Sequence, residues 1–306
     1  MSHRNELVIR DFQEMDAVGI SALFLTVYGE HYVYPDVYLP SMILRHNLQG
    51  HWRSAVACVG DRIVGHSILW MDALQPGSAE LALNVVDPSA RGLGIATRLG
   101  AHLCALARKL GLHMLTIKQV STHSQSQRLA RTLGFHTTGL LLDYVASPFG
   151  PTGRESIVLG CLPLQPRPLP DASLPQDYDA WFSPLSDIFG SGAAPDLHPT
   201  PAPMALDSQG KRLEVTFDRI ESSGLDEVER LPRNRLVYVR LPLDRSLPSC
   251  LPRLKRAGYA SAGLMPTPHG RWYWLMQRGF ETRNLSLQCA LAQKLYDDTQ
   301  RTVAAM

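Results

Sequence analysis

One short segment, residues 85–98, constrains the fold of this chain more than any other. It reads VVDPSARGLGIATR, so an apolar strand ends at Asp87 and Pro88, glycines follow, and a new periodic run begins. Glycine permits positive φ and has no Cβ, so successive backbone N–H groups can converge on an anion. A helix that starts there adds unpaired N–H groups and the positive end of its dipole. The segment therefore predicts a strand-to-helix turn suited to a pyrophosphate, with Arg91 as a charged donor.

The spacing of these glycines excludes two common classes of phosphate-binding protein. The dinucleotide fingerprint needs a third glycine and an acidic residue about 20 positions further on, and neither is present. The phosphate-binding loop of NTPases ends in Gly-Lys-Ser or Gly-Lys-Thr, which is also missing. The sequence therefore argues against a nucleotide-dependent dehydrogenase and against an NTPase.

Strands and helices alternate along the rest of the chain, which predicts a mixed α/β sheet. In the first half we expect strands at residues 7–12, 80–87, 114–120, 136–145 and 155–162, and a hairpin at 54–73. We expect helices at 15–30, 92–111 and 124–134, and an irregular helical stretch at 35–50. In the second half we expect strands at residues 212–217, 236–243, 260–266 and 271–278, and helices at 246–258 and 285–302. The apolar side chains expected to face the core are Val18, Leu23 and Val27 in the helix at 15–30, and Leu99, Leu103, Leu106 and Leu110 in the helix at 92–111.

Prolines mark the boundary between the two halves. Ten of the 22 prolines fall in residues 163–203, where they disfavour helix and central strand. We expect a domain at 1–165, a partly packed connector at 166–210 that includes a short docked helix, and a second domain at 211–306. Residues 258–265 echo residues 134–141, which suggests a degenerate half-repeat. The alternative is that any helix-to-strand turn recruits glycine.

The balance of charge and the scattered cysteines limit the partners. With 30 basic and 28 acidic residues, we expect no nucleic-acid partner, which usually needs a basic stripe. No apolar run is long enough to span a bilayer, so no membrane partner is expected, and the first residues do not resemble a secretory signal. The five cysteines form no close pairs, which predicts reduced thiols, no metal site and a cytoplasmic protein.

The glycine segment resembles the signature of the GNAT superfamily of acyl-CoA-dependent N-acyltransferases. Val86, Pro88 and the run from Arg91 to Ala96 are similar to the motif that follows the family's fourth strand. The resemblance continues in the family's Leu-x-x-x-Leu-Gly-Phe ending, which is Leu129, Leu133, Gly134 and Phe135 here. It covers residues 6–164. The run around Tyr28 and Tyr38 is similar to a GNAT subgroup that carries a distinct C-terminal extension.

This resemblance implies a fold and a cofactor. The fold would be a mixed, mostly antiparallel central sheet flanked by helices, followed by a smaller C-terminal α/β half-domain that resembles a degenerate GNAT half without a phosphate loop. Strands four and five would splay apart to admit acetyl-CoA or another acyl-CoA as co-substrate, with no metal. The implied cofactor contacts are Val86, Arg91, Gly92, Leu93, Gly94, Ile95, Ala96 and Thr97. Leu93 departs from the family, which often has Arg or Lys there; Arg98, Arg128 or Arg131 are candidates to compensate.

Transfer of an acyl group to an amine needs a base, because the nucleophile must be neutral. The family often carries that base at the position of Glu80. Residues 80 and 86 have the same parity, so both are expected on one face of the strand. A surface carboxylate at a strand end is the alternative. His123 is a weaker candidate for catalysis, and His66 and Lys118 are further polar candidates.

The general acid of the family is absent. Its tyrosine stands five residues before the terminal phenylalanine, and that position is Ala130. Either Tyr32, Tyr34 or Tyr144 serves instead, or water protonates the thiolate, or the domain does not catalyse. Tyr28, Tyr32 and Tyr34 lie in the region that covers the acceptor site in the family, although core packing is the commoner role of such rings.

We therefore expect an N-acyltransferase that moves an acetyl or other acyl group from acyl-CoA to an amine of a small molecule or protein. The alternative is a non-catalytic acyl-CoA-binding sensor or regulatory protein. The C-terminal domain is expected to help form the acceptor cleft or to mediate homodimerisation.

Overall fold

The computed structural model describes residues 6–71, 77–122, 124–147, 153–193, 204–210, 212–267, 270–281, 285 and 287–304. The chain forms two compact units. Unit 1 comprises Met1–Lys118, Arg128–Phe135 and Ala146–Arg154, and unit 2 comprises Gln119–Gln127, His136–Val145 and Glu155–Met306. These units do not test whether the chain folds as independent domains with boundaries at residues 165 and 210, and those boundaries stay a prediction.

Unit 1 contains a sheet of five strands in the order β1-β2-β3-β4-β5. The strands are β1 (Leu7–Asp11), β2 (Trp52–Val59), β3 (Arg62–Met71), β4 (Ser78–Val86) and β5 (Met114–Val120). The first four form an antiparallel meander, and β5 is parallel to β4. The turn between β2 and β3 lies at Gly60, whose φ of 60° fits the predicted hairpin.

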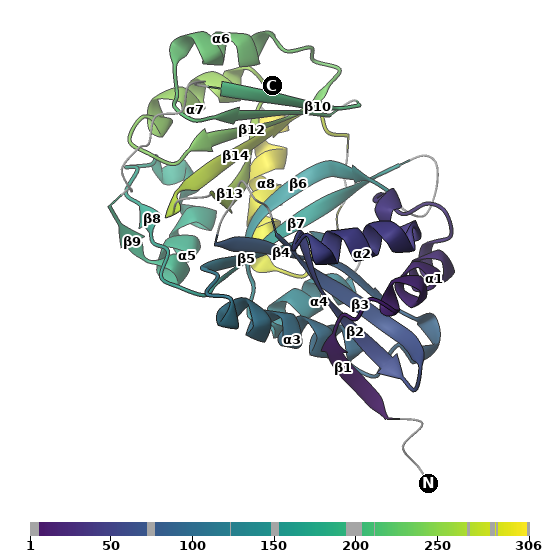
Figure 1. Ribbon diagram of the computed structural model, residues 1–306. Coiled ribbons are helices and arrows are strands. Elements are labelled where there is room, and N and C mark those ends of the chain that lie inside the picture. The colour runs from purple at the N-terminus through teal and green to yellow at the C-terminus, as the bar shows by residue number, and fades with distance from the viewer. Residues whose placement is uncertain are drawn as a thin grey trace. The chain divides into compact units, whose positions relative to one another are not determined.

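Helices cover both faces of this sheet (Figure 1). They are α1 (Asp16–Tyr28), α2 (Pro40–Leu48) and α3 (Ile95–Lys109), with a 3₁₀ turn, η1 (Pro35–Tyr38), before α2. The ring of His66 in β3 lies 5.9 Å from that of Phe24 in α1. A Cβ at the preceding Gly65 would instead stand 2.7 Å from Ile95 of α3. Because consecutive strand residues point to opposite faces, α1 and α3 lie on opposite sides of the sheet.

The core of unit 1 is built from α1, α2 and one face of the sheet. Its fully buried members include Ile20, Phe24, Ile43, Val56 and Ile68. Two sequence predictions at the edges of the helices are wrong: Val18 is 67% exposed and Leu110 44% exposed. In α1 the helical period places Ile20 and Phe24 on the buried stripe, and in α3 the stripe ends one turn earlier, with Leu103 and Ala107.

Unit 2 contains a sheet of seven strands in the order β7-β6-β13-β14-β12-β11-β10. The strands are β6 (His136–Ala146), β7 (Arg154–Pro163), β10 (Met204–Gln209), β11 (Arg212–Phe217), β12 (Leu236–Pro242), β13 (Ala260–Pro266) and β14 (Trp272–Arg278). Its helices are α5 (Asp179–Phe189), α6 (Ser222–Arg230), α7 (Leu247–Arg256) and α8 (Ala290–Ala304). Helix α4 (Ser124–Thr132) has its first turn in this unit and its remainder in unit 1.

Strands β6 and β13 meet at one closely packed point. Gly139 of β6 is the antiparallel partner of Gly263 of β13. A Cβ at Gly139 would stand 2.8 Å from the carbonyl oxygen of Ala262. A Cβ at Gly263, whose φ is 100°, would overlap the carbonyl oxygen of Thr138. These two glycines are the corresponding members of the internal echo seen in the sequence. Only residues without a side chain permit this approach.

Beyond that point a buried side chain completes the hydrogen bonding of β6. The amide of Gln277, from β14, accepts from the Leu142 N–H at 2.8 Å and donates to the Leu140 carbonyl at 3.1 Å. The Tyr238 hydroxyl of β12 donates to the Leu142 carbonyl. Gln277 is 0% exposed, so the main-chain groups of β6 would have no access to water without it.

The mixed α/β fold class predicted from the sequence is confirmed, and most predicted elements have their counterparts. The connector helix α5 docks as predicted, with the Trp181 ring 4.6 Å from that of Trp274 in β14. The sequence analysis missed α6, which carries only two buried apolar side chains, Leu225 and Val228. It also missed β10, an edge strand that pairs with β11.

Candidate active site

The glycine loop joins β4 to α3 with a rigid turn followed by two left-handed residues. Asp87 follows the last residue of β4, and its carboxylate accepts from the N–H and the hydroxyl of Ser89, at 2.8 and 2.6 Å. These hydrogen bonds lower the pKa of Asp87. Gly92 and Gly94 then have φ of 83° and 69°, and a Cβ at either position would meet no neighbouring atom within 4 Å. The loop therefore presents bare backbone to an open surface.

The N-terminus of α3 supplies unpaired donors beside this loop. Gly94 occupies the N-cap position, where it has no side chain to accept a hydrogen bond. The first intrahelical bond runs from the Arg98 N–H to the Gly94 carbonyl, at 3.0 Å. The N–H groups of Ile95, Ala96 and Thr97 precede it and have no carbonyl partner within the helix. Together with the helix dipole they suit a phosphate or pyrophosphate.

Strand β4 carries a bulge immediately before the loop. Leu83 has φ of 50°, and the register with β3 shifts by one residue between the pairs Ile68–Ala82 and His66–Val85. The last pair between β4 and β5 is Leu81–Ile117, although β4 continues to Val86. Beyond that pair the described residues of the two strands do not pair with each other. The pairing of β4 with β5 thus ends one residue after Glu80.

The bulge corrects the parity argument made from the sequence. Trp70 and His66 lie on one face of β3, and their partners in β4 are Glu80 and Val85. Because cross-strand partners share a face, Val85 rather than Val86 lies on the face of Glu80. The extra residue at the bulge reverses the alternation, and no feature of the sequence alone indicated it.

The carboxylate of Glu80 forms an ion pair with Lys118 of β5. The Oε2 and Nζ atoms lie 2.7 Å apart, and the two side chains are 27% and 34% exposed. Lys118 follows the last pair of β4 and β5, so the ion pair stands where the strands begin to separate. The structure thus brings together two of the polar residues that the sequence analysis named. Both are accessible to solvent.

The three tyrosines expected near an acceptor lie close together. The rings of Tyr28 and Tyr32 are 4.6 Å apart, and those of Tyr32 and Tyr34 are 6.2 Å apart. Burial raises the pKa of Tyr32 well above its usual value, and the negative charge of Glu80 contributes in the same direction. Burial also raises the pKa of Tyr28, while Arg91 opposes that rise.

His66 is part of the core and does not reach this surface. It is 0% exposed, and its Nε2 lies 3.2 Å from the Ser54 hydroxyl. Burial lowers its pKa to about 3, with the backbone of Leu83 acting in the opposite direction. A ring that is neutral and shielded from water cannot exchange protons with an acceptor.

The remaining candidates differ in their surroundings. Ala130, at the position of the family's acid, is buried. The Tyr144 hydroxyl donates to Glu214 at 3.0 Å within unit 2. Arg98 donates to the Leu7 carbonyl at 3.3 Å, and Leu93 is 61% exposed. His123 lies outside the described residues.

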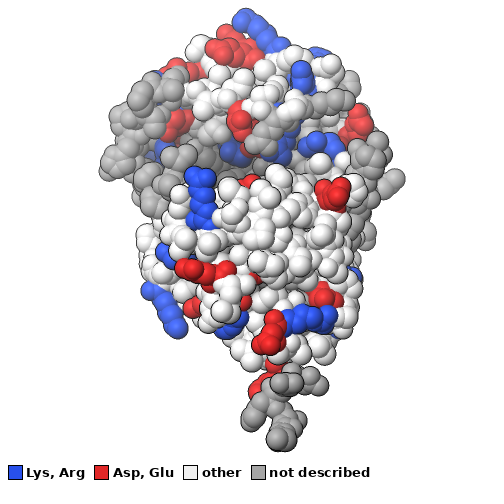
Figure 2. Space-filling view, turned by 45° about the vertical axis from the view of Figure 1, so that its right-hand side comes forward, with Lys and Arg blue, Asp and Glu red and all other residues white. Residues whose placement is uncertain are grey.

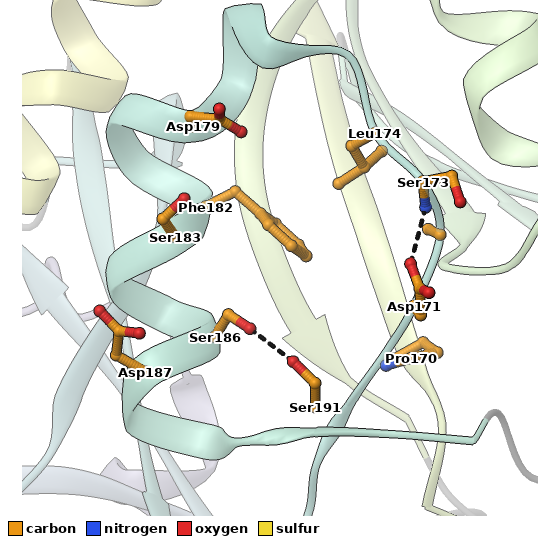
Figure 3. A pocket seen from close by; sticks show the side chains of 11 residues that line it. Pro170, Asp171, Ser173, Leu174, Asp179, Phe182, Ser183, Ser186, Asp187 and Ser191 are labelled. Carbon is orange, nitrogen blue, oxygen red and sulfur yellow. Dashed lines mark hydrogen bonds between the residues drawn. The ribbon is translucent and has the colours of Figure 1, made fainter.

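Two clefts in unit 2 differ in the charge of their linings. One, of about 450 Å³, lies between α5 and residues 170–174, with Phe182 pointing into it from α5 (Figure 3). Its described lining includes three carboxylates, Asp171, Asp179 and Asp187, and no Lys or Arg, so it does not suit a phosphorylated cofactor. The described lining of the other, of about 800 Å³, includes four basic residues, Arg233, Lys255, Arg256 and Arg301, and two acidic ones, Asp177 and Asp298. The charge of this second cleft does not exclude an anionic ligand.

The face drawn in Figure 2 shows basic and acidic side chains interspersed around a broad uncharged area. The visible described atoms do not form a continuous basic stripe of the kind that tracks nucleic acid. Among the helices in the described part of the chain, none has the length and apolar character required to cross a membrane.

Comparison with known proteins finds one family model that matches part of this chain, and solved structures that are similar to about half of it. The model of the acetyltransferase (GNAT) family matches residues 20–135. An N-acetyltransferase from Staphylococcus aureus Mu50 is 18% identical over 52% of this chain and 99% of its own, with a TM-score of 0.46. The Salmonella typhimurium protein yncA, a putative acetyltransferase solved with its cofactor acetyl-CoA, is 19% identical over 53% of this chain and 95% of its own, with a TM-score of 0.45. A ribosomal-protein-alanine N-acetyltransferase from Brucella melitensis is 23% identical over 51% of this chain and 99% of its own, with a TM-score of 0.44. Comparison with curated protein sequences finds no significant match.

Proposed function

We propose that this protein, whose residues 20–135 form a domain of the acetyltransferase (GNAT) family, transfers an acetyl group from acetyl-CoA to an amine. The observation that carries the proposal is the arrangement on β4. A carboxylate at Glu80, a bulge at Leu83 and a bare glycine loop succeed one another along a single strand-to-helix connection. Each has a separate role in the chemistry.

The residues of the loop fit the phosphates of coenzyme A. Open space at the Cβ positions of Gly92 and Gly94 lets backbone N–H groups approach a ligand, and Ile95 to Thr97 add the unpaired donors of α3. Arg91 is exposed and adds one positive charge. When bound, the cofactor supplies a thioester, which activates the acetyl group towards attack by nitrogen.

The groups around Glu80 are suited to prepare the acceptor. An ammonium group must lose a proton before its nitrogen can form the new N–C bond as the C–S bond breaks. Glu80 accepts that proton, directly or through a water molecule, while Lys118 holds the carboxylate at the point where β4 and β5 diverge. Ala130 provides no hydroxyl group, so this position could not donate a proton to the thiolate that leaves, and water would supply that proton.

Release of CoA thiol from acetyl-CoA, measured over a library of amines, tests the activity. Glu80→Gln should lower kcat/KM by about 10²- to 10⁴-fold, the usual contribution of a general base. Glu14→Gln, a change at an exposed carboxylate of the same unit, serves as the matched control and should have no effect. If the protein binds CoA tightly but turns over none of the amines, the catalytic proposal is wrong. The alternative of an acyl-CoA sensor then predicts a ligand-dependent change of oligomeric state in native mass spectra.

We also propose that residues 204–304 are a degenerate copy of the acetyltransferase fold. In unit 1, β3 and β4 are antiparallel, α3 follows β4, and β5 is parallel to β4. In unit 2, β10 and β11 are antiparallel, α6 follows β11, and β12 is parallel to β11. In chain order, β5 is followed by α4, β6 and β7, and β12 is followed in the same way by α7, β13 and β14.

A retained ion pair supports this equivalence. Glu80 pairs in register with Thr116, and its salt-bridge partner Lys118 stands two residues further along β5. Glu214 of β11 pairs in register with Tyr238, and its partner Arg240 likewise stands two residues further along β12. The same offset in both parallel pairs is expected if the two strand pairs descend from one sequence.

The second copy has lost the features of a reaction site. Glu214 is 7% exposed and also contacts Arg212 and the Tyr144 hydroxyl, so no acceptor can reach it. The short connection from β11 to α6, residues 218–221, contains no glycine, so it lacks the bare backbone that the glycine loop presents. Calorimetric titration should therefore give one CoA per chain. A stoichiometry of two would contradict this proposal without affecting the first.

The sequence also predicted a cytoplasmic location and a homodimer, which remain proposals. All five cysteines are unpaired, as is usual in a reducing compartment. Analytical ultracentrifugation would measure the oligomeric state.

A further inference from the structure

A continuous row of aromatic rings lies beside the candidate base. It consists of Tyr28 at the end of α1, Tyr32 and Tyr34 in the following segment, and Trp70 in β3. Successive ring centroids are 4.6, 6.2 and 5.1 Å apart. Tyr34 is 41% exposed and the others are partly exposed. We call these four residues the aromatic row; all of them belong to unit 1.

The row ends beside the carboxylate of Glu80. Trp70 is the antiparallel partner of Glu80, so their side chains lie on the same face of the sheet with Cβ atoms about 5 Å apart. The sequence analysis named the tyrosines but missed Trp70, because only the strand register reveals its position opposite Glu80.

Few carboxylates lie along the segment that carries the row. Glu80 pairs with Lys118. Asp36 accepts a hydrogen bond from His46 at 2.8 Å, and the His46 ring stacks on Trp52. Glu30, between Tyr28 and Tyr32 in the sequence, is exposed. Strand register places Glu80, and not Glu30 or Asp36, opposite Trp70. An acceptor with one amino group and a flat apolar body matches the rings and the carboxylate of Glu80.

From this juxtaposition we propose that the acceptor is a primary amine on a short chain that carries an aromatic ring. The ring packs against Tyr34 and Trp70, and the amino group lies at Glu80. This inference rests on the proposed acetyltransferase function and specifies its substrate class. Aromatic rings attract one another through their quadrupoles, by about 0.5–1.5 kcal/mol beyond the burial of area. That preference, and not size alone, distinguishes the proposed acceptor from an aliphatic amine.

Binding experiments test the substrate class independently of turnover. Ligand-observed NMR in the presence of CoA would compare 2-phenylethylamine with 2-cyclohexylethylamine, 2-phenylethanol and putrescine. The phenyl compound should bind about 3- to 10-fold more tightly than the cyclohexyl compound, which corresponds to the energy of one ring pair. The neutral alcohol and the diamine should bind at least tenfold more weakly. Equal affinity for the phenyl and cyclohexyl compounds, or tighter binding of putrescine, would overturn the inference.

A pair of variants shows where the ring binds. Tyr34→Leu keeps an apolar side chain at the partly exposed position 34, so it should fold normally. It should remove the preference for phenyl over cyclohexyl and leave the affinity for the cyclohexyl compound unchanged. Leu25→Ala, at an exposed position on α1, is the matched control and should preserve the preference. An equal loss for both ligands in Tyr34→Leu would show that the row does not recognise the ring.

The two proposals fail in different ways. If 2-phenylethylamine binds as expected but no amine is acetylated, the substrate site stands and the catalytic proposal is wrong. If other amines are acetylated while 2-phenylethylamine neither binds nor reacts, the acetyltransferase stands and the substrate class is wrong.

Discussion

Gln277 offers the most direct test of how β6 and β13 are held together. Its buried amide makes two hydrogen bonds to the main chain of β6, with the Leu142 N–H at 2.8 Å and the Leu140 carbonyl at 3.1 Å. Gln277→Met keeps the length and approximate volume of the side chain but removes both polar groups. The substitution therefore isolates the hydrogen bonds from the packing.

The magnitude follows from what the substitution leaves behind. Both Leu140 and Leu142 are 0% exposed, so neither main-chain group gains access to water. An unsatisfied buried group costs about 1–3 kcal/mol, and two such groups should lower the free energy of unfolding by about 2–6 kcal/mol. Gln277→Glu keeps the acceptor but replaces the donor, and it adds a buried charge, so it should be at least as destabilising.

Urea unfolding followed by circular dichroism would measure the stability, and hydrogen exchange would monitor the Leu142 amide directly. In Gln277→Met the Leu142 amide should exchange at least tenfold faster, since about 1.4 kcal/mol corresponds to a factor of ten. A stability within about 0.5 kcal/mol of wild type, with unchanged exchange at Leu142, would refute the reasoning, because surface changes produce effects of that size.

Three further predictions concern other parts of the molecule. Gly263→Ala should destabilise the protein by more than the roughly 1–2 kcal/mol typical of a left-handed residue, because its Cβ also overlaps the Thr138 carbonyl oxygen. The control is Gly210→Ala, at a position with φ of 62° in open space. Equal urea midpoints for the two variants would disprove the close contact. Burial lowers the pKa of His66 to about 3 in the folded protein, against about 6.5 in the unfolded chain. Between these two pH values the unfolded chain therefore binds a proton at His66 that the folded protein does not. Stability should fall with decreasing pH there, by up to about 1.4 kcal/mol per pH unit, and His66→Gln should remove this slope in urea titrations; an unchanged slope would contradict the assignment. Gly94→Glu should weaken CoA binding at least tenfold in calorimetry, because its carboxylate repels the phosphates. Gly94→Asn should retain most of the affinity, because asparagine tolerates the left-handed conformation. Equal losses of affinity in the two variants would indicate that the shape of the side chain, and not its charge, decides binding.

The cofactor side of the candidate site could be predicted from the sequence because its determinants are local. A strand that ends at Asp87, two glycines and a helix start are sufficient to define the loop, and the structure has Gly92 and Gly94 in the left-handed conformation that the loop needs. Helical periodicity predicted α3 and α4 for the same reason. Local conformational preferences act over a few residues, so they can be recognised without knowing what packs against them.

The acceptor side could not be predicted in the same way. A single extra residue at Leu83 changes which side chains share a face with Glu80, and the sequence around it shows an ordinary apolar strand. Lys118 was one polar residue among several until the register of β4 and β5 brought it to 2.7 Å from Glu80. These relations join strands far apart in the sequence.

By itself the sequence determined the glycine loop, the alternation of helices and strands, and the echo around Gly139 and Gly263. Only the tertiary structure decided that these two glycines pair with each other and that Trp70 stands opposite Glu80. It also decided that Glu214 is buried while Glu80 remains accessible. The physical reason is that backbone conformation depends on neighbours along the chain, whereas burial, strand register and ion pairing depend on neighbours in space.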